Sequence, residues 1–233
     1  ALGRPFVPAG FPVELYSLTG KLGAPMRVKV IDFGPILLGR ILDLNDTQTG
    51  VLSVLFKYAE DKSLAVIDLE DLKKLLNYLT TEEGANEIKE SYGKISSSTS
   101  TTILRKVVAL EQQGIAQIFG EPALDINDLF QRVDGKGVIS LLNISDIQSQ
   151  PLLFSTFLLS LLSQLFTSLP EVGDLDKPKL IFFFDEAHLL FNGASKAFLN
   201  KIEQIVRLIR SKGVGVFFCT QAATDVPDTV LGQ

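Results

Sequence analysis

The sequence contains an uninterrupted apolar run that ends in two carboxylates, Leu180-Ile181-Phe182-Phe183-Phe184-Asp185-Glu186. A second apolar run, Val214-Gly215-Val216-Phe217-Phe218-Cys219, ends in the polar pair Thr220-Gln221. Residues 194–211, between the two runs, have helical periodicity. Their apolar face is formed by Phe198, Leu199, Ile202, Ile205, Val206 and Ile209. Continuous apolar strands separated by a helix predict an α/β fold with a parallel sheet that is covered on both faces.

The polar residues that follow these two strands are the candidate site. Ligands of an open parallel sheet bind beyond the carboxyl ends of its strands. Asp185 is placed to hold Mg²⁺ at nucleotide phosphates, because Mg²⁺ prefers one or two carboxylates plus water. Glu186 is placed to polarise the attacking water, and Gln221 to sense a γ-phosphate or that water. The alternatives are an acid that caps the next helix and a loop amide bonded to backbone.

Further strands and a long helix extend this core. Residues 13–18 and 27–30 are strand-like, and residues 138–142 form another short apolar run. Pro151 to Leu169 predicts a helix, and its polar residues recur at helical spacing as one stripe: Thr156, Ser160, Ser163, Gln164, Thr167 and Ser168. A membrane span is apolar all round, so the stripe predicts a helix in a protein core, with the stripe facing polar neighbours.

The segment from Pro35 to Phe130 is predicted to be helical. Asp46 and Asp68 are the expected N-caps of two helices with apolar faces. The low-complexity run Ser96 to Thr102 is interpreted as a loop that ends in a helix N-cap. The alternative is a phosphate contact, because hydroxyls and unpaired N–H groups suit anions.

Composition limits the function classes. The 233 residues are 46% apolar, which indicates a globular chain. The net charge of −5 does not indicate the basic surface that is typical of nucleic-acid-binding proteins. A ring-shaped protein can, however, confine its basic residues to the pore. Cys219 is the single cysteine, so an internal disulfide is excluded, and this fits a reducing cytoplasm. We interpret Cys219 as a buried strand residue, and the alternative is a nucleophile. The chain lacks a secretory signal and an initial methionine, so we expect a fragment of a longer protein.

Four stretches resemble one known family. Residues 182–191 resemble the Walker-B segment of HerA-like ATPases in the HerA–FtsK superfamily, and residues 206–216 with 219–221 resemble its arginine, strand and glutamine block. Residues 44–52 and 119–125 resemble an uncharacterised bacterial HerA-like subfamily. The resemblance implies a partial RecA-like P-loop NTPase sheet with a helical insertion subdomain. It divides the chain into a strand-rich core segment (residues 1–34), the insertion (35–130) and the Walker-B and sensor part of the core (131–233).

The resemblance also implies an activity. Relatives form ATP-driven hexamers, and archaeal relatives process DNA ends. We therefore expect ATP and Mg²⁺ as cofactors, a hexameric ring without membrane contact, and a DNA translocase or helicase. Arg210 aligns with the family's arginine finger, whereas Arg207 is spaced i, i+4 from Glu203 for a helix ion pair. His188 lies three residues after Asp185, as in DEAH-box helicases, but the other helicase blocks are absent. It is interpreted as a first-turn helix residue, and the alternative is a residue that faces the active site.

The sequence departs from the family in one respect: it contains no G-x-x-x-x-G-K-[ST] phosphate-binding loop. The closest glycine pair, Gly34 and Gly39, lacks the lysine and the hydroxyl. Relatives carry this loop upstream of the residue where this chain begins, so no nucleotide-binding residue is assigned here, and the chain alone is expected to be inactive. The alternatives are a non-catalytic member that binds a partner and a regulatory ATPase that changes state without translocating.

Overall fold

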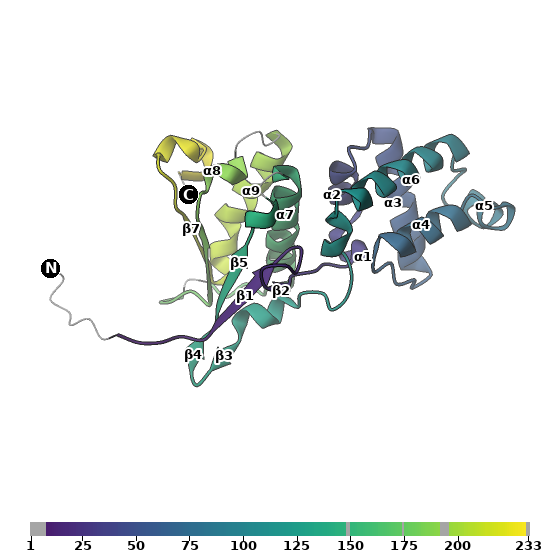
Figure 1. Cartoon of the computed structure of the whole chain (residues 1–233). Coiled ribbons are helices and arrows are strands. Elements are labelled where there is room, and N and C mark those ends of the chain that lie inside the picture. The colour runs from purple at the N-terminus through teal and green to yellow at the C-terminus, as the bar shows by residue number, and fades with distance from the viewer. Residues whose placement is uncertain (1–7, 148–149, 174, 192–195, 232–233) are drawn as a thin grey trace.

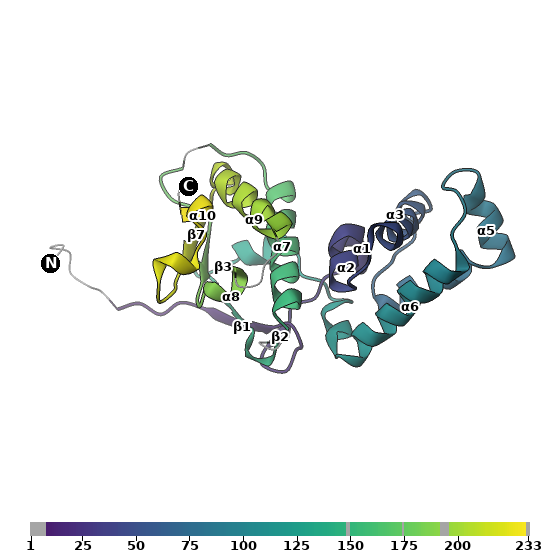
Figure 2. The same ribbon diagram turned by 90° about the horizontal axis from the view of Figure 1, so that it is seen from above.

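The computed structural model describes residues 8–147, 150–173, 175–191 and 196–231 (Figure 1). The strands and helices α7 to α9 lie at one end of the molecule, and helices α2 to α6 lie together at the other end (Figure 2). The strands are β1 (Val13–Ser17), β2 (Ala24–Pro25), β3 (Arg132–Val133), β4 (Lys136–Gly137), β5 (Ile139–Asn143), β6 (Leu180–Phe184) and β7 (Val214–Phe218).

The parallel pairing that the sequence predicts is confirmed. β1 lies between β2 and β5 and runs parallel to both, and β6 pairs in parallel with β7. Phe184 lies opposite Phe218 in the second pair, so both strands end at the same edge of the sheet. β3 and β4 form a separate antiparallel ribbon. The apolar runs that precede Asp185 and Thr220 are therefore neighbouring strands.

The prediction of a strand over residues 27–30 is wrong in part. Arg27 and Val28 make only isolated bridges, to Ala123 and Phe119. A short helix, α1 (Val30–Phe33), begins at the end of the predicted strand. Val30 and Phe33 are both buried, and a spacing of three residues places two side chains on the same face of a helix but on opposite faces of a strand.

The remaining helices are α2 (Pro35–Ile41), α3 (Asp46–Asp61), α4 (Leu69–Tyr78), α5 (Glu82–Lys89), α6 (Ser97–Gln112), α7 (Pro151–Ser168), α8 (His188–Phe191), α9 (Lys196–Ile209) and α10 (Asp228–Leu231). Short 3₁₀ helices are η1 (Ile115–Ile118), η2 (Ile126–Phe130), η3 (Ser145–Ile147), η4 (Arg210–Lys212) and η5 (Ala223–Asp225). The predicted helix over residues 194–211 therefore corresponds to α9 and η4. Residues 194 and 195, and the side chain of Phe198, lie outside the described part of the chain.

Helix caps show where local sequence chemistry acts. Asp68 caps α4 as predicted, because its side chain accepts a hydrogen bond from the Asp71 N–H at 3.0 Å. The cap of α3 is one residue earlier than predicted: Asn45 accepts from the Gln48 N–H at 2.9 Å, and the Gln48 side chain accepts from the Asn45 N–H at 3.2 Å. This reciprocal pair satisfies two N–H groups, which the Asp46 side chain alone would not do.

The serine and threonine run is helical and not the predicted loop. Ser96 occupies the N-cap position of α6, and the helix includes the rest of the run. The hydroxyls of Ser100, Thr101 and Thr102 donate to the carbonyls four residues earlier, at 2.8–3.1 Å. Such bonds let hydroxyl residues remain in a helix. The apolar face that follows, with Ile103 and Val107 buried, holds the segment against its neighbours.

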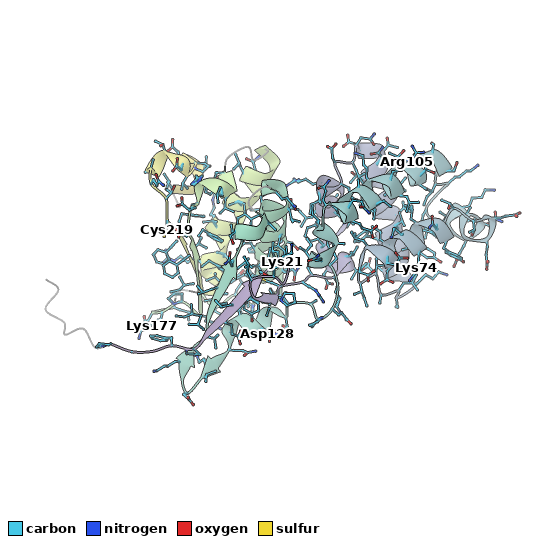
Figure 3. The ribbon with its side chains drawn as sticks, viewed as in Figure 1. Lys21, Lys74, Arg105, Asp128, Lys177 and Cys219 are labelled. Carbon is cyan, nitrogen blue, oxygen red and sulfur yellow. The ribbon has the colours of Figure 1, made fainter. Side chains whose placement is uncertain are left out.

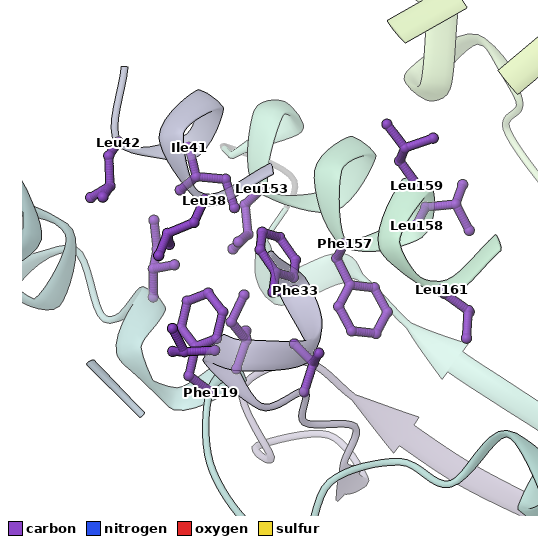
Figure 4. Packing of buried hydrophobic residues seen from close by; sticks show 14 of the residues in the cluster. Phe33, Leu38, Ile41, Leu42, Phe119, Leu153, Phe157, Leu158, Leu159 and Leu161 are labelled. Atoms are coloured by element: carbon purple, nitrogen blue, oxygen red, sulfur yellow. The ribbon is translucent and has the colours of Figure 1, made fainter. Parts of the chain in front are cut away.

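Helix α7 is the centre of the packing. It contacts α2, α8 and α9, and Figure 4 shows its Leu153 and Phe157 beside Phe33 and Phe119 of the helical end. Thr156 and Ser160 of the predicted stripe are buried, and Gln164 donates to the Ser160 hydroxyl at 3.2 Å, so part of the stripe is satisfied within the helix. Within the described part of the chain, no helix combines the length and apolarity needed to cross a membrane.

The expectation that the sheet is covered on both faces is wrong for the described residues. Phe182, Phe184 and Val216 pack against the buried core. On the other face Phe183 is 66% exposed and stacks on Phe217, with ring centroids 4.9 Å apart. Alternate side chains of a strand point to opposite faces. Helices α7 and α9 lie on only one side of β6 and β7, so the second apolar face remains open (Figure 2).

Candidate active site at the ends of strands β6 and β7

Asp185 and Glu186 form the turn that joins β6 to α8. The Cys219 N–H donates to the Phe184 carbonyl at 2.8 Å, and the Ala187 N–H donates to the Cys219 carbonyl at 3.0 Å. Cys219, the residue that follows β7, is therefore hydrogen-bonded to both ends of the turn. Ala187, the last residue of the turn, is fully buried. This pairing places the two carboxylates at the carboxyl end of β6, directly beside the end of β7.

The Asp185 carboxylate is exposed and suits a hydrated magnesium ion. Its Oδ1 accepts from the Glu186 N–H at 3.0 Å, so it does not cap α8, which begins at His188. Among the residues that the structure describes, no three or more His, Cys, Asp and Glu side chains gather where they could hold a metal. Asp185 therefore fits an ion held by one carboxylate, water and phosphates, as Mg²⁺ is usually held, and not an all-protein cage.

Glu186 has a strained backbone. Its φ is +50°, in the left-handed region that residues other than glycine rarely adopt. The bonds that Cys219 makes on either side of the turn hold this conformation. The Glu186 side chain is exposed, and its Oε2 lies 3.3 Å from Nδ1 of His188, the first residue of α8. Strained residues of this kind persist where the surrounding structure determines them, often at functional sites.

The residues after β7 form a second, well-bonded turn. The Thr220 hydroxyl donates to Asp225 at 2.6 Å, and the Ala222 N–H donates to the same oxygen at 3.3 Å. The Thr220 hydrogen bond lowers the pKa of Asp225, and the Ala222 N–H and the charge of His188 act in the same direction. Gln221, the predicted sensor, is exposed at the tip of this turn. No pattern in the sequence points to Asp225, because only the fold of the turn brings it to Thr220.

The structure does not bring Arg210 to this edge. Arg210 lies in η4, before the first residue of β7, whereas Gln221 follows the last residue of that strand. It lines a hollow of about 150 Å³ with Leu175 and Pro178. The neighbouring Lys212 is buried, donates to the Leu169 carbonyl at 2.6 Å and lies 4.9 Å from the centre of the Phe166 ring. Arg207 pairs with Glu203 at 2.6 Å, as its spacing predicts.

Gly34 is the N-cap of α2, and Gly39 lies inside α2, where an added Cβ would come 3.1 Å from the Thr49 hydroxyl. Gly39 therefore allows the close packing of α2 on α3, and Gly34 serves as a helix cap, so neither position indicates a phosphate-binding loop. The expectation that Cys219 is buried is wrong. It is exposed beyond the end of β7 (Figure 3), because it shares the open face of the sheet with Phe217, two residues earlier.

Comparison with known proteins identifies the fold. The bacterial conjugative coupling protein TrwB in its unbound form is 13% identical, with a TM-score of 0.52 over 95% of this chain and 60% of that chain. TrwB in complex with ADP and Mg²⁺ is 14% identical, with a TM-score of 0.53 over 96% of this chain and 60% of that chain. TrwB with a non-hydrolysable ATP analogue is 14% identical, with a TM-score of 0.54 over 94% of this chain and 55% of that chain.

These likenesses confirm the predicted RecA-like P-loop NTPase sheet with added helices. The chain spans only 55–60% of the solved chains that it matches. A search of curated proteins by sequence finds no match. The profile of the helicase HerA-like C-terminal family, by contrast, matches residues 2–233. The chain therefore belongs to the helicase HerA-like C-terminal family.

Proposed function

We propose that the full-length protein is a ring-shaped motor that hydrolyses Mg-ATP and translocates or unwinds DNA. One observation carries the proposal: Asp185 and Glu186 follow β6 directly, beside the turn after β7 that holds Gln221. Two carboxylates at the carboxyl end of a parallel strand, next to a polar turn of the neighbouring strand, suit a magnesium nucleotide. Family membership and the solved TrwB complexes with ADP, Mg²⁺ and an ATP analogue support it.

Each residue of this edge has a distinct role in the proposal. Bound Mg²⁺ would neutralise charge on the transferring phosphoryl group. Asp185 would hold the ion through its hydration shell, and the exposed Glu186 carboxylate would orient the attacking water and accept its proton. The Gln221 amide contacts the γ-phosphate or that water. The Cys219 hydrogen bonds keep the two carboxylates in register with Gln221, because they join the ends of the two strands.

The phosphate-binding loop is proposed to come from another segment of the full-length protein. In that organisation residues 1–34 and 131–233 belong to the ATPase core, and residues 35–130 form a helical insertion. The separate grouping of α2 to α6 supports the insertion (Figure 1). The open apolar face at Phe183 and Phe217 supports a further covering segment, because parallel sheets are normally covered on both faces.

The decisive test is Glu186→Gln in the full-length protein. This substitution keeps the shape of the side chain and removes the carboxylate, so turnover should fall by roughly 10²–10⁴-fold while ATP affinity changes little. Asp185→Asn should instead weaken the Mg²⁺-dependent part of ATP binding. Steady-state ATPase rates and calorimetric titration with and without Mg²⁺ measure both effects. Unchanged turnover in Glu186→Gln would remove this edge from the mechanism.

Arg210 is proposed to act on the nucleotide of a neighbouring subunit. It precedes β7, so the whole strand, about 17 Å at ~3.3 Å per residue, separates it from the Gln221 edge. A head-to-tail ring can present this far end to the next subunit's site. A guanidinium there would stabilise charge on the transferring phosphoryl group, an effect of roughly 10³–10⁵-fold in known cases.

Mixing two inactive full-length variants tests this arrangement. Arg210→Ala rings and Glu186→Gln rings are each expected to be nearly inactive. Mixed rings contain sites with an intact Glu186 and a neighbour's intact Arg210, so part of the activity should return. Arg207→Ala is the control for loss of a helix-end cation, and it should leave turnover nearly unchanged. Failure of mixing to restore activity, although subunits exchange, would remove the trans role.

A second candidate function is a non-catalytic or purely regulatory protein. The observation that favours it is the absence of a phosphate-binding loop from the sequence. A non-catalytic protein would leave Mg-ATP unbound even at full length. A regulatory ATPase would hydrolyse ATP at a rate that DNA does not change, whereas the motor is expected to be stimulated by DNA. ATPase assays of the full-length protein with and without DNA separate all three.

A further inference from the structure

The Glu186 side chain leaves a fixed backbone but is itself exposed. Two hydrogen bonds to Cys219 close the turn around the residue, and its φ of +50° is set by them. The side chain is 49% exposed, and a glutamate rotates about three side-chain bonds. The backbone alone therefore does not determine where the carboxylate lies, and a second group is needed to hold it.

His188 is the side chain in contact with this carboxylate. Its Nδ1 lies 3.3 Å from Oε2 of Glu186. His188 begins α8, and the following Leu190 and Phe191 are buried, so the imidazole is carried on an anchored element. Asp225 is a further charged group near the imidazole, and its pKa is lowered mainly by Thr220 and also by His188. Asp225 is itself bonded to Thr220 at 2.6 Å and belongs to the other turn.

We propose that His188 is a positioning residue that orients Glu186 for its role in ATP hydrolysis. In this role the Nδ1–H group of His188 would donate to Oε2, from which Nδ1 is 3.3 Å away, and Oε1 would be left to accept the proton of the attacking water. This inference rests on the proposed function, and it adds to that site the first residue of α8. Hydrogen bonds of this type are commonly long before the substrate binds, so 3.3 Å is within the expected range.

The proposal makes a prediction about the proton on the imidazole. A neutral imidazole carries one N–H, and the hydrogen bond that it makes decides which nitrogen bears it. Donation to Glu186 requires the Nδ1–H tautomer. His188 is the single histidine of the 233 residues, so the ring ¹⁵N signals of histidine-labelled protein belong to it alone. The 233-residue chain is sufficient for this measurement, and no nucleotide is needed.

The ring ¹⁵N shifts of a neutral imidazole report its tautomer, so the spectra are recorded in alkaline solution. We expect Nδ1–H in the unsubstituted chain and a change to Nε2–H in Glu186→Ala. Asp225→Asn is the matched control, because it removes the other nearby carboxylate and should preserve Nδ1–H. An Nε2–H form in the unsubstituted chain, or a change in Asp225→Asn alone, would overturn the contact.

Turnover of the full-length protein tests the consequence. His188→Ala should lower kcat by roughly 10–100-fold through misplacement of the base, with KM for ATP changed less than about threefold. His188→Asn retains an N–H near the Nδ1 position and should keep most of the activity. In a Glu186→Gln background, His188→Ala should cost less than about twofold more, because its effect is already lost.

Two outcomes separate this inference from the proposed function. Two results would overturn the positioning role and leave the proposed function intact. One is a double variant in which His188→Ala lowers kcat by its full factor again. The other is a His188→Ala protein with unchanged kcat, where Glu186→Gln lowers kcat strongly. A Glu186→Gln protein with unchanged turnover overturns the proposed function instead. Thermal unfolding of each variant is compared with that of His188→Asn, so that loss of folding is recognised.

Discussion

At the scale of single residues, Glu186 combines an unfavourable backbone conformation with the catalytic role proposed for it. Its left-handed backbone is unfavourable for a residue with a Cβ, by about 1–2 kcal/mol. The Cys219 hydrogen bonds and the buried Ala187 hold it there. Such strain is tolerated where the side chain has a task that glycine or asparagine could not perform. Backbone preference therefore does not explain a glutamate at position 186, whereas the catalytic role proposed for it would.

Replacing Glu186 by asparagine should therefore stabilise the chain. Asparagine adopts the left-handed region more readily, so the free energy of unfolding should rise by about 1 kcal/mol. Urea unfolding of the 233-residue chain measures this. The same replacement at Glu203, inside α9, is the control and should be destabilising, because asparagine is a poorer helix former and the Arg207 pair is lost. Equal effects at the two positions would argue against strain at Glu186.

At the scale of elements, one carboxylate links three helices of the helical end. Glu87 of α5 accepts hydrogen bonds from the Tyr58 hydroxyl of α3 at 2.8 Å and the Tyr78 hydroxyl of α4 at 3.0 Å. It also pairs with Lys62. Lys62, followed by the two hydroxyls, lowers the pKa of Glu87 to about 2. The ionised carboxylate is therefore favoured in the folded state.

This network predicts an acid-dependent stability. The folded pKa of Glu87 lies below its unfolded value near 4.5, so its contribution is present above about pH 4.5 and lost as pH falls towards 2. In Glu87→Gln, the unfolding free energy should decline less steeply over that range than in the unsubstituted chain. Glu83→Gln, an exposed neighbour on the same helix, is the control. Parallel pH profiles for all three chains would contradict the network's role.

The open face of β6 and β7 belongs to the same scale. Its Phe183 ring stacks on Phe217 but is otherwise largely in water, whereas Phe182 on the other face packs against the core. An exposed aromatic pair binds apolar dyes and other apolar surfaces. Its removal should cost little, because stacking contributes only about 0.5–1.5 kcal/mol beyond burial.

Phe183→Thr should therefore lower the binding of an apolar fluorescent dye to the 233-residue chain, with unfolding free energy changed by no more than about 1.5 kcal/mol. Phe182→Thr, at the neighbouring position on the packed face, is the matched control. It should be clearly more destabilising, by about 2–4 kcal/mol, because it removes a ring that contacts the core. A similar cost at both positions would mean that the two faces are equally covered in solution.

At the scale of the whole molecule, the described edge holds carboxylates but no phosphate cradle. Backbone N–H groups around the β-phosphate and a lysine supply most of the affinity of P-loop proteins for nucleotides. The sequence contains no such loop, and its nearest glycine pair is in helix α2. The 233 residues alone should show no measurable ATPase activity, and calorimetric titration with Mg-ATP should be flat. Micromolar binding would place the phosphate site within these residues.

The sequence by itself determined the features that depend on local pattern. Apolar runs that end in Asp185 and in Thr220 predicted two parallel strands, and helical periodicity predicted α7 and α9. Asp68 was identifiable as a cap because a capping side chain bonds within its own first turn. The two wrong predictions in this region were also local. The cap of α3 is Asn45 and not Asp46, which differs by one residue, and the serine run bonds to carbonyls one helical turn earlier and so joins α6.

The tertiary structure alone decided the features that depend on distant partners. Cys219 closes the turn at Glu186 from more than thirty residues away, and no local pattern records that pairing or the positive φ that results. The exposure of Cys219 and Phe183 depends on which face of the sheet the helices cover. The contact between His188 and Glu186 requires both the strained turn and the start of α8. Periodicity predicts which element forms, but only packing determines its neighbours, because burial and contact are properties of the assembled chain.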